Sequence, residues 1–407
     1  MRPINLTTVT SRPLHAVQFT QAAGERMVAA LAAALDGSGP AIMPLDPALS
    51  GPALARIHES FSDAAVRDDT ALVITTSGST GEPKAVELSA AALTASAAAS
   101  LRRIGAGPGE RWLCCLPTFH IAGIGVLVRS LMAGLEPVVV PAVSPQVIAA
   151  SGCAHVSLVP TQLRRLLDAG ASPGTIRTVL LGGAAPSASL LADARSAGWR
   201  VVTTYGMSET CGGCVYDGIP LDEVSVRLGA DTLAADTVQA TTGQATTGHA
   251  TTGQIEIAGP VLFSGYLGRP DLTSAVVRDG WFRTADLGWR GPDGSLRVSG
   301  RADDLINTGG EKVVPGQVEA ALGTCQGVAD VVVVGVPDPD WGEAVTAFVV
   351  ATDPAYPPDL EDLRSHVRQA VSVYAAPKRV VVVSEFPLLP SGKPDRAALR
   401  QIGHQGA

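Results

Sequence analysis

The sequence has no long apolar run and no excess of basic residues. No stretch approaches the ~18 consecutive apolar residues of a membrane helix, and residues 1–17 contain no apolar core of signal-peptide length. The formal net charge of -8 gives no overall positive field for duplex nucleic acid. We therefore expect a cytoplasmic protein that neither spans a membrane nor binds nucleic acid.

Cysteine and aromatic residues are also scarce. Six cysteines in 407 residues are too few for a disulfide framework. Cys114 and Cys115 fall in an expected buried strand, whereas Cys211 and Cys214 have the spacing of a zinc or redox pair but no second pair to match them. We interpret all four as structural. Hydrophobic residues make up 46% of the chain, which is enough to build the cores of two or three domains.

Short β-rich runs alternate with helical patterns between residues 70 and 206. This order predicts an α/β fold, and runs that are apolar on both faces indicate a parallel sheet covered by helices on each side. Helices are expected to begin at Ser144, Thr161 and Ser187, which can cap them. The expected strands are residues 71–76, 111–117, 137–142, 155–160, 178–183 and 200–206.

The character of the sequence changes near residue 300. A Pro-Asp-Gly turn at 292–294 predicts a hairpin, and helices at Pro315 to Leu322 and at residues 359–371 predict a smaller α+β unit. We expect a large N-terminal domain of layered, mostly parallel sheets and helices, residues 1–302, and a small mobile domain, residues 303–407. The Thr/Gly repeat at 240–254, with His249 inside it, is expected to be an exposed loop without chemistry.

Residues 73–86, VITTSGSTGEPKAV, raise the question of phosphate binding. The P-loop motif places lysine directly after its last glycine, but here Glu82 and Pro83 separate Gly81 from Lys84. Glycines still allow backbone N–H groups to approach an anion, hydroxyls add donors and the lysine adds charge. Taken alone, the segment is also compatible with a polar turn at the end of a strand.

Five ordered motifs resolve this ambiguity through a resemblance. They are TTSGSTGEPK at 75–84, TYGMSET at 204–210, TAD at 284–286, GRADDLINTGGEKVVP at 300–315 and LPSGKPDR at 389–396. Together they resemble the signatures of the adenylate-forming superfamily, which includes acyl- and aryl-CoA ligases, adenylation domains of peptide synthetases and luciferases. The resemblance implies that a carboxylate attacks the α-phosphate of ATP to give an acyl-adenylate, from which a thiol, usually that of coenzyme A, displaces AMP.

The resemblance also implies roles for individual residues. Tyr205 would stack on adenine, Ser208 would contact the α-phosphate, and Glu209 would ligate Mg2+, which prefers oxygen ligands. Asp286 would accept both ribose hydroxyls, with Arg301 beside it. The implied ATP-binding set is Thr76, Ser77, Gly78, Ser79, Thr80, Gly81, Lys84, Gly183, Ala184, Thr204, Tyr205, Gly206, Ser208, Asp286 and Arg301.

The small domain would have to move between the two steps. By resemblance, Lys393 bridges the substrate carboxylate and the α-phosphate in the first step, and the domain then rotates about Asp303. The rotation would bring Gly309 and Gly310 to the pantetheine arm of CoA.

Within the superfamily, residues 116–134 and 204–224 look most like the o-succinylbenzoate–CoA ligases of menaquinone biosynthesis, in their compact actinobacterial form. Such an acid carries an aromatic ring and a second carboxylate, near which His120, Ser208, Thr210 or the backbone at 212–213 could donate hydrogen bonds. No arginine is singled out by the sequence. Other aryl- or acyl-CoA ligases, a carrier-protein-loading adenylation enzyme and a non-catalytic nucleotide-binding protein are the alternatives, and the sequence leaves a homodimer open.

Overall fold

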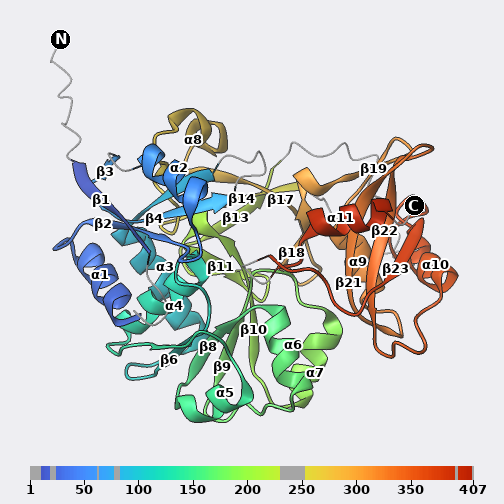
Figure 1. Ribbon diagram of the computed structural model, residues 1–407, viewed down its shortest axis with the longest axis horizontal. Helices are drawn as coiled ribbons and strands as arrows, with labels where there is room; N and C mark the ends of the chain where they lie inside the picture. The colour runs from blue at the N-terminus through green and yellow to red at the C-terminus, as the bar shows by residue number, and fades with distance from the viewer. Residues whose placement is uncertain are drawn as a thin grey trace.

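The computed structural model describes residues 11–18, 24–61, 64–77, 83–229, 253–389 and 393–405. Figure 1 shows a large N-terminal domain and a smaller C-terminal domain beside it. Three sheets belong to the N-terminal domain, and a fourth sheet belongs to the C-terminal domain. The mixed α/β class expected from the sequence is confirmed.

The first sheet has six strands in the order β15-β5-β4-β2-β1-β3. Only β1–β2 and β2–β4 are parallel pairs. Its strands are β1 (Ser11–Gln18), β2 (Ala41–Leu45), β3 (Ala65–Arg67), β4 (Thr70–Ser77), β5 (Pro83–Ser89) and β15 (Gly265–Tyr266), and the helices from this region of the chain are α1 (Gly24–Asp36), α2 (Gly51–Phe61) and α3 (Ala90–Ile104).

The second sheet has seven strands in the order β12-β11-β10-β9-β8-β6-β7, and the five from β10 to β7 are parallel. Both faces of its central strands are buried, which explains why Val and Leu predominate in them, although His155, Ser157 and Thr178 are buried there as well. The strands are β6 (Trp112–Cys114), β7 (Val138–Val139), β8 (His155–Leu158), β9 (Thr178–Leu181), β10 (Val201–Met207), β11 (Gly212–Tyr216) and β12 (Ile219–Pro220), and the helices are α4 (Ile121–Met132), α5 (Pro145–Ser151), α6 (Pro160–Asp168) and α7 (Ala188–Ser196).

The main apolar core lies between these two sheets, where α3 and α4 pack against each other. Leu72 and Leu88 of the first sheet share one buried cluster with Leu93 of α3, Leu127 of α4 and Val215 of β11. This layer of helices fixes the start of α4 relative to the ends of β10 and β11.

A third sheet, entirely antiparallel, was not expected from the sequence. It contains β13 (Ser225–Leu228), β14 (Gly253–Ala258), β16 (Val277–Arg278), β17 (Trp281–Arg290) and β18 (Leu296–Arg301), with α8 (Pro270–Val276) before β16. The predicted hairpin is its β17–β18 pair. The Thr/Gly repeat lies outside the described residues up to Thr252, and Gly253 begins β14.

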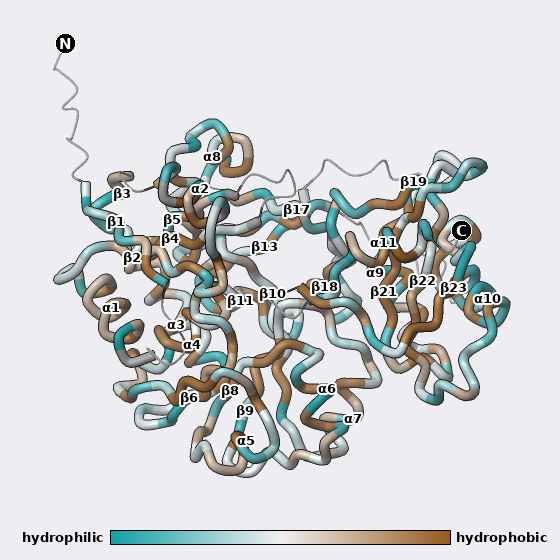
Figure 2. Tube along the Cα trace, viewed as in Figure 1, coloured by the Kyte–Doolittle hydropathy of each residue, from teal (hydrophilic) through white to brown (hydrophobic). Residues whose placement is uncertain are grey.

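The C-terminal domain is a five-stranded mixed sheet with three helices. Its two longest strands, β21 (Val328–Asp338) and β22 (Gly342–Ala351), are predominantly hydrophobic (Figure 2). The other strands are β19 (Ile306–Thr308), β20 (Glu311–Val313) and β23 (Arg379–Val382), and the helices are α9 (Pro315–Leu322), α10 (Leu360–Ala370) and α11 (Arg396–Gln405). The expected domain boundary falls in the short helix η3 (Ala302–Asp304), which separates β18 from β19.

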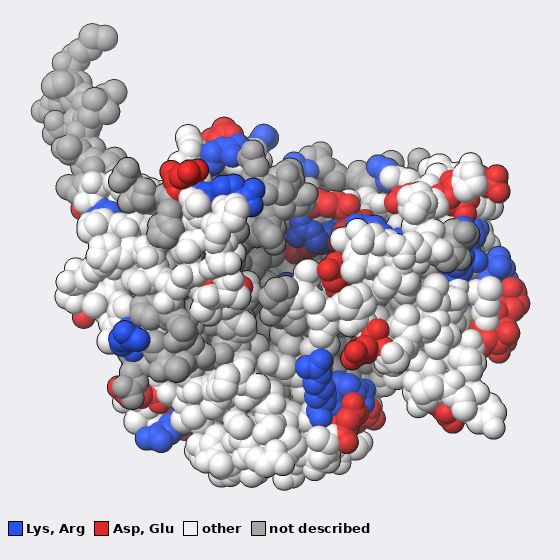
Figure 3. Space-filling view, viewed as in Figure 1, with Lys and Arg blue, Asp and Glu red and all other residues white. Residues whose placement is uncertain are grey.

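Contacts between the two domains run along α7 and α9. Ser189 Oγ donates to Ala329 O at 3.5 Å, and charged atoms gather over α6 and α7 (Figure 3). Within the N-terminal domain, Arg164 of α6 forms an ion pair with Asp193 of α7 at 2.8 Å. Gly316 of α9 approaches β18 so closely that a Cβ on it would lie 2.2 Å from Ser299 O.

Most predicted helix boundaries agree with the structure. Ser144 and Ser187 cap α5 and α7 through their side chains, and Asp359 caps α10. The expected start of a helix at Thr161 was wrong by one residue: α6 begins at Pro160, because the Gln162 side chain accepts a hydrogen bond from Val159 N at 3.1 Å.

Candidate active site between the two domains

The candidate site is built on the carboxyl ends of β9 and β10, which meet at one edge of the parallel sheet. A Cβ on Gly182 would lie 2.5 Å from Thr204 Oγ1, and one on Gly206 would lie 1.9 Å from Gly212 O. Only glycine fits at these positions. Gly183 has a φ of +85°, and it is exposed together with Ala184 in the loop after β9.

Tyr205 and Asp286 form a half-buried hydrogen-bonded pair at this edge. The Tyr205 hydroxyl donates to Asp286 Oδ2 at 2.7 Å. Burial raises the pKa of Asp286, against the effects of Tyr205, Arg301 and Lys393, and burial together with Asp286 raises the pKa of Tyr205. A neutral phenol therefore holds one carboxylate oxygen in place.

Arg301 links this pair to the junction between the domains. Its guanidinium donates to Asp303 Oδ2 at 2.6 Å and lies 3.9 Å from Asp286 Oδ1. Burial acts to lower the pKa of Arg301, but Asp303 and Asp286 outweigh it and raise the pKa. The residue expected near the ribose and the expected hinge residue are thus in direct contact.

A second group of residues lies where the phosphates are expected. The Tyr266 hydroxyl donates to Glu209 Oε1 at 2.9 Å, and Lys84 Nζ is 5.3 Å from the centre of the Tyr266 ring. Glu209 belongs to the short helix η2 (Ser208–Thr210), which follows β10 directly. The predicted Gly78, Ser79, Thr80 and Gly81 lie outside the described residues, and Thr76 and Ser77 end β4.

The donor set at Glu209 fits a magnesium ion that arrives with ATP. Among the described residues no group of three or more His, Cys, Asp or Glu side chains could hold a metal ion by itself. Mg2+ is typically bound by one or two carboxylates together with substrate phosphates. One carboxylate beside a lysine suits that arrangement.

Lys393 of the C-terminal domain reaches into the N-terminal domain. A Cβ on Gly183 would lie 3.7 Å from Lys393 Cε. Burial lowers the pKa of the lysine, as does Arg301, whereas Asp286 raises it. The residue as a whole remains exposed to solvent.

His120 lies near Lys393, immediately before α4. Its side chain makes no capping hydrogen bond and packs on the Phe119 ring, with 4.6 Å between ring centroids. Burial lowers the pKa of His120, and the nearby charge of Lys393 lowers it further while Asp46 raises it. The imidazole is therefore neutral at pH 7, and it can donate one hydrogen bond.

Thr210 is buried and its hydroxyl is already used. It accepts from Met207 N at 2.9 Å and lies 2.7 Å from Gly212 O, to which it can donate. These bonds shape the turn that presents Ser208 and Glu209. The expected contact of Thr210 with the acid stays a prediction.

Sequence reasoning missed Arg129, which is buried in the last turn of α4. Its side chain is 9% exposed; Nη2 donates to Ser157 Oγ at 3.0 Å, and the guanidinium lies 4.5 Å from the centre of the Trp112 ring. Nε has no hydrogen-bond partner, and no carboxylate of the described residues forms an ion pair with the side chain.

Arg129 shares a helix face with the start of the site. Ile121, Gly125 and Arg129 are spaced by four residues, so they line one side of α4. A Cβ on Gly125 would lie 3.3 Å from Arg129 Nη1, and one on Gly212 would lie 3.9 Å from Ile121 Cγ1. The guanidinium therefore lies one helical turn below the contact between Ile121 and β11.

One predicted region lies apart from this cluster. Gly309 and Gly310 form the turn between β19 and β20, where Gly309 packs on Trp341 and Gly309 N donates to Trp341 O at 2.8 Å. Figure 1 shows β19 on the side of the C-terminal domain away from β10. Cys211 and Cys214 are buried thiols whose pKa values burial raises, that of Cys214 to about 12.

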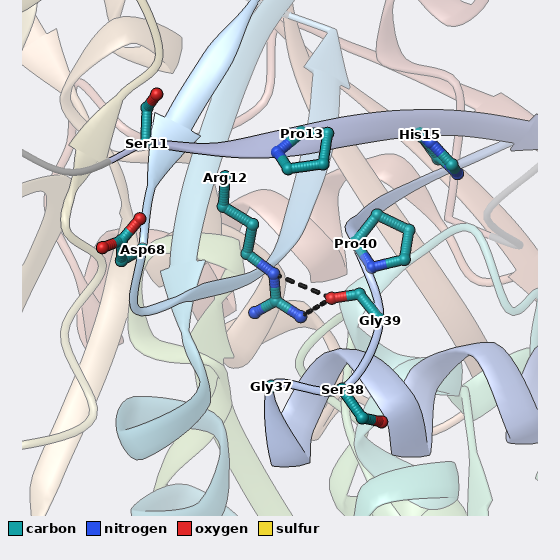
Figure 4. A pocket seen from close by; sticks show the side chains of 9 residues that line it. All are labelled: Ser11, Arg12, Pro13, His15, Gly37, Ser38, Gly39, Pro40 and Asp68. Atoms are coloured by element: carbon teal, nitrogen blue, oxygen red, sulfur yellow. Dashed lines mark hydrogen bonds between the residues drawn. The ribbon is translucent and has the colours of Figure 1, made fainter.

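A surface hollow of about 530 Å3 near Arg12 is a structural feature (Figure 4). The Arg12 guanidinium donates to Gly39 O, Ala34 O and Thr70 O, so it saturates the carbonyls at the end of α1. The hollow lies at the far edge of the first sheet, next to β1, and none of the site residues lines it.

Comparisons with known proteins agree with this geometry. Residues 19–267 match the AMP-binding enzyme family, and residues 317–393 match the AMP-binding enzyme C-terminal domain. The "Probable 2-succinylbenzoate–CoA ligase" of Mycobacterium tuberculosis is 42% identical over 92% of this chain and 94% of the relative. The 2-succinylbenzoate–CoA ligase of Bacillus velezensis is 32% identical over 82% of this chain and 69% of the relative.

Solved structures are also similar to this chain over most of its length. The o-succinylbenzoate CoA synthetase (MenE) of Bacillus subtilis, in complex with the acyl-adenylate intermediate OSB-AMP, has a TM-score of 0.70 and 28% identity, covering 92% of this chain and 81% of that one. ATP-bound MatB from Rhodopseudomonas palustris has a TM-score of 0.80 and 25% identity, covering 97% and 89%. Within the described residues, none of the helices has the length and apolar character that crossing a membrane requires.

Proposed function

Because the chain belongs to the AMP-binding enzyme family, we propose that it is an AMP-forming acid–thiol ligase that converts 2-succinylbenzoate to 2-succinylbenzoyl-CoA. The relatives named for this reaction match nearly the whole chain. ATP and CoA are the co-substrates, Mg2+ accompanies ATP, and the reaction takes place in the cytoplasm.

In the first step an oxygen of the succinyl carboxylate attacks the α-phosphorus of ATP. The bond to the bridging oxygen breaks, and pyrophosphate leaves with the bonding electrons. The reacting anions repel one another, so cations and hydrogen-bond donors must offset their charge. Lys393 neutralises the charge between carboxylate and α-phosphate, and Lys84 binds the departing pyrophosphate. Glu209 would hold the Mg2+ that accompanies ATP, and this ion would offset the charge of the phosphates. The proximity of Lys393 to Gly183 supports the role of this lysine.

In the second step the CoA sulfur, as thiolate, attacks the acyl carbon and AMP leaves. Between the two steps the C-terminal domain rotates about Asp303. The rotation removes Lys393, which has no role in the second step, and brings Gly309 and Gly310 to the pantetheine arm. Gly309 packs directly on Trp341, because a Cβ at this position would lie 2.8 Å from the indole ring. A backbone without side chains at this turn suits the passage of the narrow pantetheine arm.

The observation that carries the substrate assignment is the buried guanidinium of Arg129, which contacts Ser157 and Trp112 but forms no ion pair with a carboxylate of the described residues. A buried charge without a partner is strongly unfavourable, and arginine keeps its proton under all ordinary conditions. An anion is the missing partner. Gly125 lies beside the Arg129 guanidinium, and His120 lies near Lys393. These two positions are five residues apart, about 7.5 Å of helix rise. This spacing suits an acid whose first carboxylate meets Lys393 and whose ring carboxylate meets Arg129.

The test compares two acids that differ by one carboxylate. Pyrophosphate release is measured with 2-succinylbenzoate and with 3-benzoylpropionate, which lacks the ring carboxylate, each with CoA and no carrier protein. We expect kcat/KM to be about 100-fold higher for 2-succinylbenzoate, because charged hydrogen bonds are lost with the other acid. Equal values, or a strong preference for a fatty acid, would contradict the proposal.

Arg129→Met sharpens this comparison. It should lower kcat/KM for 2-succinylbenzoate to the level of 3-benzoylpropionate and leave the value for 3-benzoylpropionate nearly unchanged. Arg102→Met is the control, because Arg102 is an exposed arginine of α3 that pairs with Asp222. An equal loss for both acids in Arg129→Met would indicate a purely structural role for this arginine.

A further inference from the structure

Tyr266 connects the two groups that the proposed function assigns to the phosphates and their metal ion. Its hydroxyl donates to Glu209 Oε1 at 2.9 Å, and its ring lies under Lys84 Nζ at 5.3 Å. Among the described residues, the second carboxylate oxygen of Glu209, Oε2, has no hydrogen-bond partner. The sequence motifs did not point to this tyrosine.

The position of Tyr266 is fixed on several sides. The residue is 7% exposed, and β15 pairs with β5 so that Tyr266 lies opposite Val86, two residues after Lys84. Tyr266 N donates to Thr273 Oγ1 at 2.9 Å, and its ring packs edge-on against Phe263. Phe263 N in turn donates to Glu209 O at 2.9 Å.

We propose that Tyr266 restricts Glu209 to one metal-coordinating oxygen and thereby selects Mg2+ over Ca2+ as the ion that accompanies ATP. The inference rests on the proposed metal role of Glu209 and adds to it a determinant of ion specificity. Tyr266 is a positioning residue, because it acts through Glu209 and Lys84 rather than on the reacting atoms.

The physical reason lies in how the two ions use carboxylates. Ca2+ takes six to eight oxygen ligands at about 2.3–2.6 Å and readily accepts both oxygens of one carboxylate. Mg2+ requires near-octahedral geometry at about 2.0–2.1 Å and is usually held by single oxygens together with phosphates and water. A phenol that donates a hydrogen bond to Oε1 makes this oxygen less available as a second ligand and so favours the single-oxygen mode that suits Mg2+.

The ring of Tyr266 has a separate effect on Lys84. A cation over an aromatic face is attracted by the ring, more strongly where water is excluded. The same side chain therefore keeps the lysine and the carboxylate at a fixed spacing. Removing only the hydroxyl should change ion preference, whereas removing the ring should also weaken nucleotide binding with either ion.

The experiment measures binding rather than turnover. Isothermal titration calorimetry gives the Kd of a non-hydrolysable ATP analogue in Mg2+ and in Ca2+, without acid or CoA, for the full-length protein. Tyr266→Phe should lower the ratio of Kd in Ca2+ to Kd in Mg2+ by about fivefold or more. Tyr216→Phe is the matched control, because it removes a buried hydroxyl that bonds Ser100 away from this site, and it should leave the ratio unchanged.

Three further variants distinguish a failure of the inference from a failure of the proposed function. Glu209→Asp shortens the carboxylate and breaks the same hydrogen bond, so it should lower the ratio even if Tyr266→Phe folds poorly. Tyr266→Leu should weaken binding with both ions. An unchanged ratio in folded Tyr266→Phe overturns the inference. Wild-type Mg2+-dependent affinity in Glu209→Gln would instead overturn the metal role of Glu209 on which the inference rests.

Discussion

The Tyr205 hydroxyl donates a 2.7 Å hydrogen bond to Asp286, which joins the end of β10 to the middle of β17. The bond occupies Oδ2 and leaves Oδ1 directed toward the side of Arg301. A phenol that is fixed in this way cannot move independently of the carboxylate. The predicted adenine and ribose contacts therefore belong to one rigid unit.

Asp286→Asn should weaken AMP binding by about tenfold or more, because an amide is a poorer acceptor for ribose hydroxyls than a carboxylate. Calorimetry with AMP measures the change. Asp217→Asn is a suitable control, because Asp217 also accepts hydrogen bonds from β10, at Thr203, but lies outside the site. An unchanged Kd in Asp286→Asn would remove Asp286 from the nucleotide site.

Lys393→Ala should reduce adenylate formation by at least about 100-fold, since one charged contact to the transition state is lost. Attack of CoA on supplied 2-succinylbenzoyl-AMP should fall much less, because that step uses the other domain arrangement. Single-turnover assays of each half-reaction measure both rates. Equal losses in the two half-reactions would refute the domain rotation.

Adenylate formation should fall in alkaline solution earlier than an ordinary lysine would predict. Burial lowers the pKa of Lys393 from its usual 10.5, and the ammonium form, present below that pKa, is the active one. The rate should therefore decline as pH rises through the lowered value. The test is the pH profile of pyrophosphate release, with Lys393→Arg as comparison. The arginine variant, however slow, should show no such decline, and identical profiles would contradict the assignment.

Gly316→Ala should disturb the contact between the domains. The added Cβ would meet Ser299 O at 2.2 Å, and a backbone atom cannot yield as a flexible side chain can. We expect slower adenylate formation and a smaller effect on CoA attack. Ala320→Ser, an exposed change on the same helix, is the control. Wild-type rates in Gly316→Ala would show that this packing is not needed for the first step.

The sequence was most informative where chemistry needs adjacent residues. The strands and caps of the parallel sheet followed from periodicity and from Ser144 and Ser187, and the family followed from five ordered motifs, which the family match confirms. The assignments of individual site residues and of the domain boundary stay predictions. Of the antiparallel sheet only the β17–β18 hairpin was expected, because the repeat separates β13 from β14 in the chain and β16 has only two residues.

Arg129 and Tyr266 could not be predicted because their roles depend on contacts distant in the chain. Ser157 lies 28 residues from Arg129, and Glu209 lies 57 residues from Tyr266. A weak signal did exist for Arg129, which is the single charged residue between Phe119 and Leu135. A lone charge within so apolar a helix is unusual, since arginine is rarely buried without a partner.

The ion pair between Arg301 and Asp303 has a mechanical consequence. Any turn of the backbone at Asp303 must either carry the Arg301 guanidinium with it or pull the two charges apart. In the proposed mechanism, release of the ribose by Arg301 and rotation of the C-terminal domain about Asp303 are therefore coupled, and a tightly bound nucleotide opposes the rotation.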